Sequence, residues 1–373
     1  LNEWSDINFY FNIGKCIFNG KPLYIDSFDH KGPLIFFIYG FGYLISNASF
    51  LGMFFIQLIA WLIFIYAVYL TFNLYLKKEF AFTATLFVPV FIMMFTQEGG
   101  SAEEFILIFQ SVSLFFFVKY FKDKNTIAHN PVHMFLHGLL CSMVLFTKIN
   151  LVVFWAFPIL FIFINLIINK EYKNLFLNIL TFTGGIVIIA APICLYLYMN
   201  DALTEAYNIY ILLNKKYASN NGIGNIISNL ALRFYQCLRA DPIGFLTVLV
   251  GAIWFPLKFI GNRWGKLSLW ASAFLMYIVI FMSPRFYSYY PLPFYVFVIP
   301  GAIVLFSYLQ QYITIRYTKS LLIGFAAIAL LINISNKNFF GLTAQNLLRI
   351  VPEKGLVEQF GEEITKDNNP TLF

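Results

Sequence analysis

The chain has 373 residues, of which 60% are hydrophobic, 20% aromatic and only 12% charged. A soluble domain carries about twice that share of charged residues and could not hide so many apolar side chains, and a disordered chain needs low hydrophobicity. The net charge of +7 comes from Lys and Arg scattered between apolar runs, which does not indicate a nucleic-acid partner. We therefore predict an all-α polytopic membrane protein.

The chain opens with a polar, acid-containing segment, 1–32, ahead of its first apolar run. Within it, Ser5 begins a helix-like stretch that continues to about Asn19, and we predict a surface helix there. The first residue is Leu and no signal peptide precedes it, so we expect the natural N-terminus, with one more span, to be missing. The abrupt end at Phe373 suggests a second truncation.

The apolar runs that follow predict a transmembrane bundle over residues 33–335. A helix needs about 20 mostly apolar residues to cross a bilayer. The run 33–46 is only 14 residues long, which favours an interfacial or half-crossing helix. The bundle also contains an outer loop, 200–241, and is followed by a tail, 336–373. The ten longer runs are predicted spans: 50–76, 80–97, 104–121, 132–147, 151–168, 175–199, 242–258, 266–283, 290–309 and 319–335.

The distribution of charge orients these spans. Twelve basic residues and only three acids fall in five short loops, which we place in the cytoplasm because cytoplasmic loops are enriched in Lys and Arg. The acid-containing segments then lie on the extracytoplasmic side. These segments are 1–32, 97–104, 200–241, 284–289 and 336–373.

The unusual polar clusters all lie on that predicted extracytoplasmic side. Asp6 either caps the surface helix or is a catalytic carboxylate held at the membrane surface. Asp29, His30 and Lys31 come directly before Gly32-Pro33, which turns the chain into a helix. This cluster is either a solvated loop in which Lys31 extends to the interface, or a site where Lys31 binds a phosphate beside a helix N-terminus.

Two further clusters and one isolated lysine offer the same choice between structure and function. Glu103 and Glu104 either stabilise the N-terminus of a span or are functional acids at its mouth. Arg285, with Tyr289 and Tyr290, suits a phosphate or forms part of an aromatic belt. Lys148 is a cation at the same face, either an interfacial anchor or a further phosphate ligand.

Together these positions resemble the GT-C superfamily of polyprenyl-phosphate-sugar-dependent glycosyltransferases. The most similar branch is the family-39-like enzymes, related to protein O-mannosyltransferases and the aminoarabinose–lipid A transferase. Asp6 matches the acid of the family's first loop, although the common Asp-Glu pair reads Asp6-Ile7 here. Lys31-Gly32-Pro33-Leu34 matches a Lys-Pro-Pro-Leu element. Glu103 and Glu104 match the second acidic site, and Arg285 to Tyr290 match the late basic-aromatic segment.

This resemblance implies a GT-C-like helical bundle that transfers a sugar, with inversion, from a polyprenyl-phosphate donor to a glycan, lipid or protein acceptor. Asp6 would deprotonate the acceptor, and Glu103 or Glu104 would orient hydroxyl groups. The donor phosphate would lie among Lys31, Lys148, Arg285, Tyr289 and Tyr290, with Asp29 and His30 beside it. We assign no cofactor, and the sequence leaves open whether a divalent metal ion binds.

Two other functions are compatible with a polytopic chain. A lipid-linked oligosaccharide polymerase or ligase predicts a large outer loop with several Arg, whereas segment 200–241 holds only Arg233 and Arg239. A transporter or flippase predicts charged residues deep inside spans, and this chain keeps nearly all of them at span ends. We expect an integral protein of a bacterial cell membrane with its site on the extracytoplasmic face.

Overall fold

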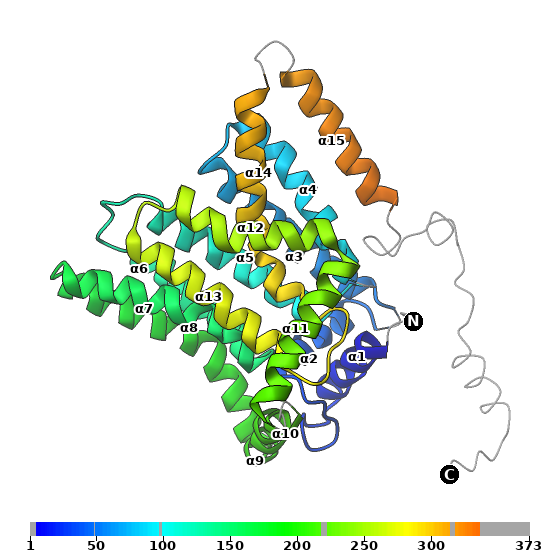
Figure 1. Cartoon of the computed structure of the whole chain (residues 1–373). Helices are drawn as coiled ribbons and strands as arrows, with labels where there is room; N and C mark the ends of the chain where they lie inside the picture. Colours follow the sequence, from blue (N-terminus) through cyan, green and yellow to red (C-terminus); the bar gives the residue numbers. More distant parts are fainter. Residues whose placement is uncertain (1–4, 48, 97–98, 218–221, 314–317, 336–373) are drawn as a thin grey trace, which may run out of the picture.

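The computed structural model describes residues 5–47, 49–96, 99–217, 222–313 and 318–335, and within these ranges the chain forms helices and no strand (Figure 1). In chain order they are α1 (Ser5–Phe18), α2 (Pro33–Ile45), α3 (Leu51–Asn73), α4 (Lys78–Thr96), α5 (Ala102–Phe121), α6 (Pro131–Leu145), η1 (Ile149–Val152), α7 (Val153–Ile168), α8 (Tyr172–Met199), α9 (Leu203–Ala206), the π-helix η2 (Tyr207–Leu213), α10 (Asn214–Tyr217), α11 (Ile223–Ala240), α12 (Pro242–Phe259), α13 (Arg263–Phe281), η3 (Leu292–Phe297), α14 (Val298–Tyr312) and α15 (Thr318–Ser335).

Each predicted span coincides with a helix, which confirms the all-α polytopic fold class. Among the described residues, eight helices are long and apolar enough to cross a membrane. The predicted spans 132–147 and 319–335 correspond to α6, with 15 residues, and to the apolar stretch Ser320–Asn333 of α15, which are shorter. The run 33–46 forms α2, with 13 residues.

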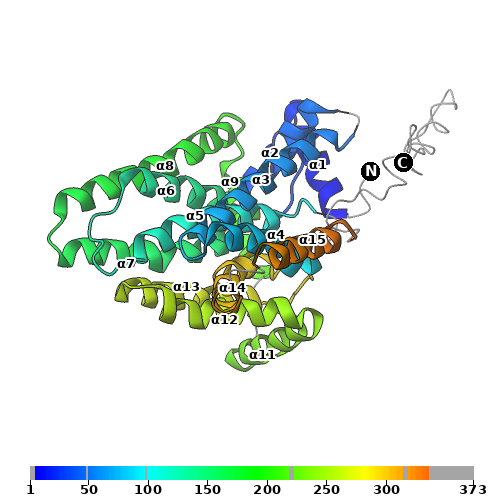
Figure 2. The ribbon, with the colours of Figure 1, turned by 90° about the horizontal axis from the view of Figure 1, so that it is seen from above.

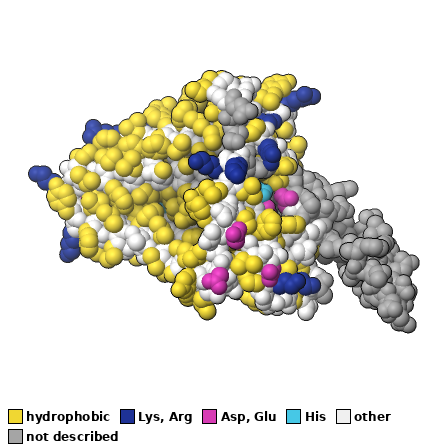
Figure 3. Space-filling view, turned by 90° about the horizontal axis from the view of Figure 1, so that it is seen from below, with side chains coloured by type: hydrophobic (Ala, Val, Ile, Leu, Met, Phe, Trp, Pro, Cys, Tyr) yellow, Lys and Arg dark blue, Asp and Glu magenta, His cyan; other side chains and the backbone are white. Residues whose placement is uncertain are grey.

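Helix α5 lies at the centre of the bundle and is buried along most of its length, in contact with α3, α6, α13 and η3. Helix α8 packs on α6 at the outer edge of the bundle, as Figure 2 shows, and exposes large apolar side chains such as Phe176 and Met199. In Figure 3 apolar side chains cover much of the surface, the visible acidic and histidine side chains gather toward the right, and basic side chains lie both there and at the opposite edge. This surface fits a chain surrounded by lipid, with polar groups at both ends.

The two ends of the bundle differ as the charge distribution predicts. Helices α1, α2, α9 and α10 lie together at one end (Figure 1). Three of the short basic loops contact one another: the loop after α3, the loop after α5 and the loop after α12. The Lys122 Nζ donates a hydrogen bond to the Leu74 carbonyl (2.7 Å), and the Gly261 N–H donates one to the Lys122 carbonyl (2.8 Å).

The segment 200–241, predicted as an outer loop, is largely helical and consists of α9, η2, α10 and α11. In α11, Leu230, Phe234 and Leu238 recur every four residues and pack against the core. The Tyr277 hydroxyl also donates a hydrogen bond to the Leu230 carbonyl (2.8 Å). The low overall hydropathy of the segment hides this amphipathic pattern. The predicted tail 336–373 and residues 97–98 lie outside the described residues.

Candidate functional site: a buried carboxylate between two lysines

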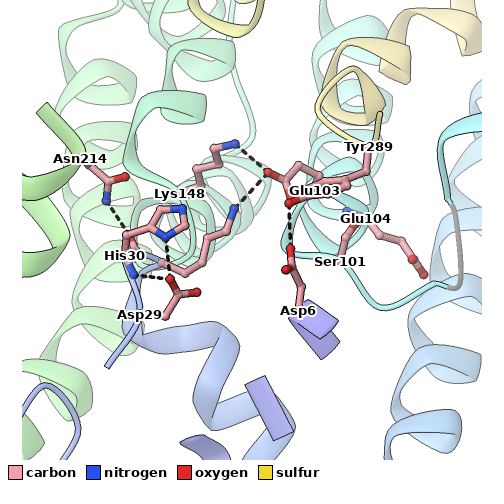
Figure 4. Close-up of polar contacts among 10 residues, drawn as sticks. Asp6, Asp29, His30, Ser101, Glu103, Glu104, Lys148, Asn214 and Tyr289 are labelled. Atoms are coloured by element: carbon pink, nitrogen blue, oxygen red, sulfur yellow. Dashed lines mark hydrogen bonds and ion pairs between the residues drawn. The ribbon is translucent and has the colours of Figure 1, made fainter. Parts of the chain in front are cut away.

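The site is built where α1, the loop before α2, the N-terminus of α5 and the loop before η3 meet (Figure 4). These four segments supply Asp6, Lys31, Glu103 and Tyr289, which lie far apart in the sequence. The α6–η1 connection adds Lys148. The structure therefore brings together residues from most of the polar clusters that the sequence singles out.

Backbone packing at Gly32 sets the spacing between the two lysines. The Gly32 N–H donates to the Thr147 carbonyl (3.0 Å) and the Leu34 N–H donates to the Phe146 carbonyl (2.9 Å). A Cβ atom at Gly32 would collide with the Phe146 carbonyl, so only glycine allows the two loops to approach this closely. As a result Lys31, directly before Gly32, lies beside Lys148, directly after Thr147.

Glu103 joins these lysines. Its Oε1 accepts a hydrogen bond from the Lys148 Nζ at 2.6 Å and from the Lys31 Nζ at 3.3 Å, and Glu103 is fully buried while Lys31 is 2% exposed. Buried charges persist in proteins when they are paired in this way. The other oxygen, Oε2, is buried and has no hydrogen-bond partner among the described residues.

Lys148 also lies 4.0 Å from the centre of the Tyr290 ring, and Lys31 lies 5.8 Å from the same ring. The pKa of Lys148 is lowered to about 8, chiefly by burial, with the positive charge of Lys31 adding to the shift and Glu103 opposing it. The two ammonium groups thus form a compact, partly neutralised pair of cations over an aromatic face.

The second acid of the site, Asp6, is half-buried and is the second residue of α1, in its first turn. Its Oδ2 accepts a hydrogen bond from the Tyr289 hydroxyl at 2.8 Å. The helix predicted from Ser5 is present as α1. It ends before Gly20, whose φ of +77° lies in the left-handed region that favours glycine. The hydroxyl of Tyr289, which the sequence assigns to the donor phosphate, is the group that donates this hydrogen bond to Asp6.

Asp29 and His30 form a pair at the edge of the site. The His30 Nδ1 lies 2.5 Å from the Asp29 Oδ1, and the Asn214 side chain donates a hydrogen bond to the His30 carbonyl. Burial raises the pKa of Asp29, but the hydrogen bonds and charge of His30, together with the charge of Lys31, outweigh it and hold that pKa below its usual value. Asp29 therefore stays ionised at neutral pH.

Glu104 faces away from this cluster, as Figure 4 shows. Its carboxylate accepts hydrogen bonds from the Trp61 indole N–H of α3 (2.6 Å) and from the Gly100 N–H (2.6 Å). Gly99 and Gly100 both have positive φ, as expected for the tight turn before α5. Glu104 thus holds this turn to α3, and the structure separates it from Glu103.

A cavity of about 280 Å³ opens beside the two lysines. Its polar lining comes from Lys31, Lys148, Lys215 and His30, with the amides of Asn150 and Asn214. Its apolar lining comes from Leu151, Ile211, Val279, Ile280 and Met282, among others. A space lined by both cations and hydrocarbon fits a ligand that is part anion and part lipid.

Sequence reasoning missed Lys215 and Asn214. Both lie at the start of α10, in the segment that was predicted as a loop, and the adjacent pair Lys215-Lys216 on the acid-rich side was the available signal. Conversely, Arg285 is exposed and does not line the cavity. Beside it, Arg233 donates a hydrogen bond to the Pro284 carbonyl (3.0 Å) and lies 4.9 Å from the Phe286 ring.

In the described part of the chain, no group of three or more His, Cys, Asp or Glu side chains is arranged to hold a metal ion. The acids of the site are instead bonded to lysine, tyrosine or histidine. These residues supply acid–base and electrostatic chemistry.

The bundle and its site define a polytopic membrane protein of the GT-C superfamily. The sequence model described as dolichyl-phosphate-mannose-protein mannosyltransferase matches residues 21–208, half of the chain, and the chain belongs to this family. A comparison with curated proteins finds no match.

Two solved structures show the same fold. One is the archaeal oligosaccharyltransferase AglB from Archaeoglobus fulgidus in complex with an inhibitory peptide and a dolichol-phosphate, which is 16% identical, with a TM-score of 0.51 over 98% of this chain and 54% of that chain. The other is the Archaeoglobus fulgidus oligosaccharyltransferase in complex with Zn and sulfate, which is 17% identical, with a TM-score of 0.53 over 98% of this chain and 52% of that chain. The chain thus spans about half the length of these proteins.

Proposed function

We propose that this chain is a membrane glycosyltransferase that moves a sugar from a polyprenyl-phosphate-linked donor to an extracytoplasmic acceptor, with inversion at the anomeric carbon. The observation that carries the proposal is the cavity lined by Lys31, Lys148 and Lys215 together with apolar side chains, two of these lysines being paired with the buried Glu103. Membership of the mannosyltransferase family supports a lipid-linked donor. The short basic loops at the opposite end support an extracytoplasmic site in a cell membrane, which we take to be bacterial.

The donor phosphate would lie among the three lysines, with its polyprenyl chain against Val279 and Ile280. As the sugar leaves, the bond from the anomeric carbon to the phosphate oxygen breaks and the phosphate keeps the electron pair. Cations placed where that charge develops stabilise the transition state. Lys31 and Lys148 are already held in place by Glu103 and by the Gly32 contact.

The acceptor would approach from the side of Asp6. The Asp6 carboxylate takes the proton of the acceptor hydroxyl while the oxygen attacks the anomeric carbon, on the face opposite to the phosphate. A base must lie within hydrogen-bond reach of the hydroxyl that it deprotonates, and Oδ1 of Asp6 is the oxygen that Tyr289 leaves open. The unpartnered Oε2 of Glu103 is suited to orient a sugar or acceptor hydroxyl. The acceptor is a cell-envelope glycan, lipid or protein.

Binding of undecaprenyl phosphate to the purified chain in nanodiscs tests the donor site. Replacing Lys31 with Ala removes one charge-assisted hydrogen bond and should weaken binding about 10- to 100-fold. The matched control is Lys216→Ala, which alters the neighbour of Lys215 but not the cavity lining. Lys31→Arg, which keeps the charge, should bind better than Lys31→Ala.

Transfer of labelled mannose from polyprenyl-phosphate mannose to a cell-envelope fraction tests the reaction. The wild type should transfer label, and Lys31→Ala should transfer it more slowly than Lys216→Ala. Equal binding and equal transfer by these two variants would mean that the lysine is an interfacial anchor and that the phosphate site lies elsewhere.

A further inference from the structure

Two neighbouring tyrosines in the loop before η3 touch the two halves of the site separately. The Tyr289 hydroxyl is hydrogen-bonded to Asp6, the proposed base. The Tyr290 ring lies under the Lys148 ammonium group, which belongs to the proposed phosphate site. Both tyrosines are more than nine-tenths buried, and their ring centres are 5.2 Å apart.

We propose that Tyr289 is a positioning residue that orients the Asp6 carboxylate and, through Tyr290, makes the alignment of Asp6 depend on whether the phosphate site is occupied. This proposal rests on the proposed function and concerns the same site. It changes the assignment of Tyr289, because the sequence alone groups Tyr289 and Tyr290 together as donor ligands.

The charges around Tyr289 make it a hydrogen-bond donor. Burial, reinforced by the negative charges of Glu103 and Asp6, raises the pKa of the Tyr289 hydroxyl well above its ordinary value. The hydroxyl therefore keeps its proton and donates a hydrogen bond to the Asp6 Oδ2. The other titratable groups facing Asp6 are Tyr10 from its own helix and Tyr39 from α2, both buried. A hydrogen bond to one carboxylate oxygen fixes the direction of the other, which the acceptor hydroxyl must meet.

The backbone provides the connection between the two halves. The Tyr290 N–H donates to the Tyr287 carbonyl (3.1 Å) and the Leu292 N–H donates to the Tyr289 carbonyl (3.2 Å), so the tyrosine pair sits in consecutive turns. A phosphate that draws Lys148 toward itself changes the contact of that ammonium group with the Tyr290 ring. In a turn held at both ends, a shift of Tyr290 is passed to Tyr289 and so to Asp6.

The test compares Tyr289→Phe with Tyr287→Phe, at an exposed tyrosine of the same loop that does not line the cavity, as the matched control. Both variants keep an aromatic ring and lose one hydroxyl group. Tyr289→Phe should lower kcat about 10- to 100-fold, the effect of one hydrogen bond to a charged group. It should leave the binding of undecaprenyl phosphate unchanged, and it should move the acid limb of the pH–rate profile to higher pH, because a hydrogen bond to a carboxylate favours its charged form. Tyr287→Phe should change neither the pH profile nor kcat by more than a few-fold.

A third variant, Tyr290→Leu, tests the coupling. It removes the ring under Lys148, so it should weaken binding of undecaprenyl phosphate and also lower kcat at saturating donor. Combined with Tyr289→Phe, it should cause no further loss of kcat, because the connection to Asp6 is already broken. Fully multiplicative losses in the double variant would overturn the coupling.

Two results separate this proposal from the proposed function. Weaker phosphate binding by Tyr289→Phe, with an unshifted pH profile, would mean that Tyr289 is a donor ligand and would overturn the positioning role while leaving the transferase intact. A wild-type protein that neither binds undecaprenyl phosphate nor transfers mannose would overturn both.

Discussion

Replacing Asp6 with Asn separates a structural from a catalytic role, because the two side chains have the same shape. The Asn side-chain oxygen can still accept the hydrogen bond from the Tyr289 hydroxyl. The loss in folding stability is then the difference between a charged and a neutral hydrogen bond, about 1 kcal/mol, plus about 0.3–1 kcal/mol for a negative charge in the first turn of α1. We therefore expect a small decrease in the thermal unfolding temperature.

The expected effect on the reaction is much larger. An amide cannot take the proton of the acceptor hydroxyl, and the loss of a general base lowers turnover about 100-fold or more, or at least about 2.7 kcal/mol of barrier. The assay is the initial rate of mannose transfer from polyprenyl-phosphate mannose, measured together with undecaprenyl phosphate binding, which should not change. Asp26→Asn, at an exposed acid of the loop before α2, is the control.

A rate for Asp6→Asn within about three-fold of the wild type would refute the reasoning. Asp6 would then only stabilise the first turn of α1 and hold Tyr289. The base would have to be sought at Glu103, whose Oε2 has no hydrogen-bond partner among the described residues.

Three further predictions follow from the lysine pair. Glu103→Gln leaves Lys31 and Lys148 without their buried counter-charge and should lower the free energy of unfolding by about 3–5 kcal/mol, measured by denaturation in detergent. An unchanged free energy of unfolding would show that the ion pairs of Glu103 with these lysines do not stabilise the fold. Because the pKa of Lys148 is about 8, this lysine loses its positive charge as the pH rises through that value, and the protein should bind undecaprenyl phosphate more weakly there. The variant Lys148→Arg should keep its affinity for undecaprenyl phosphate up to about pH 10, because arginine stays charged. Gly32→Ala places a Cβ against the Phe146 carbonyl and should weaken undecaprenyl phosphate binding about 10-fold, because the two lysines move apart. An unaffected affinity would mean that the two loops move to accommodate the Cβ.

The helices and the convergence of the polar segments could be predicted from the sequence, for a physical reason. Apolar runs of bilayer length fix where the chain crosses, and the excess of Lys and Arg on one side fixes which loops share an end. Asp6, Lys31, Glu103 and Lys148 all lie at one end, as the charge distribution predicts, although nothing in the sequence gives the distances between them.

The pairings within the site could not be predicted in the same way. Adjacent residues on a helix point about 100° apart, so only one of Glu103 and Glu104 can face the lysines, but the sequence does not say which. The bond from Tyr289 to Asp6 joins residues 283 positions apart and follows from the packing of the whole bundle. Lys215 was missed because the segment that carries it is polar overall, and its helices form only against the rest of the protein.

The carboxylate between the two lysines has a consequence for turnover. Lys31 and Lys148 are not unpaired cations, because Glu103 neutralises part of their positive charge. At the proposed donor site, an arriving phosphate would therefore share these cations with a resident anion, and a departing one would leave them with a counter-ion within 3.3 Å. Such an exchange would moderate the affinity for donor and product alike, which favours release. The ground state would then be bound less tightly, and the cations would act most strongly when the leaving phosphate gains its charge.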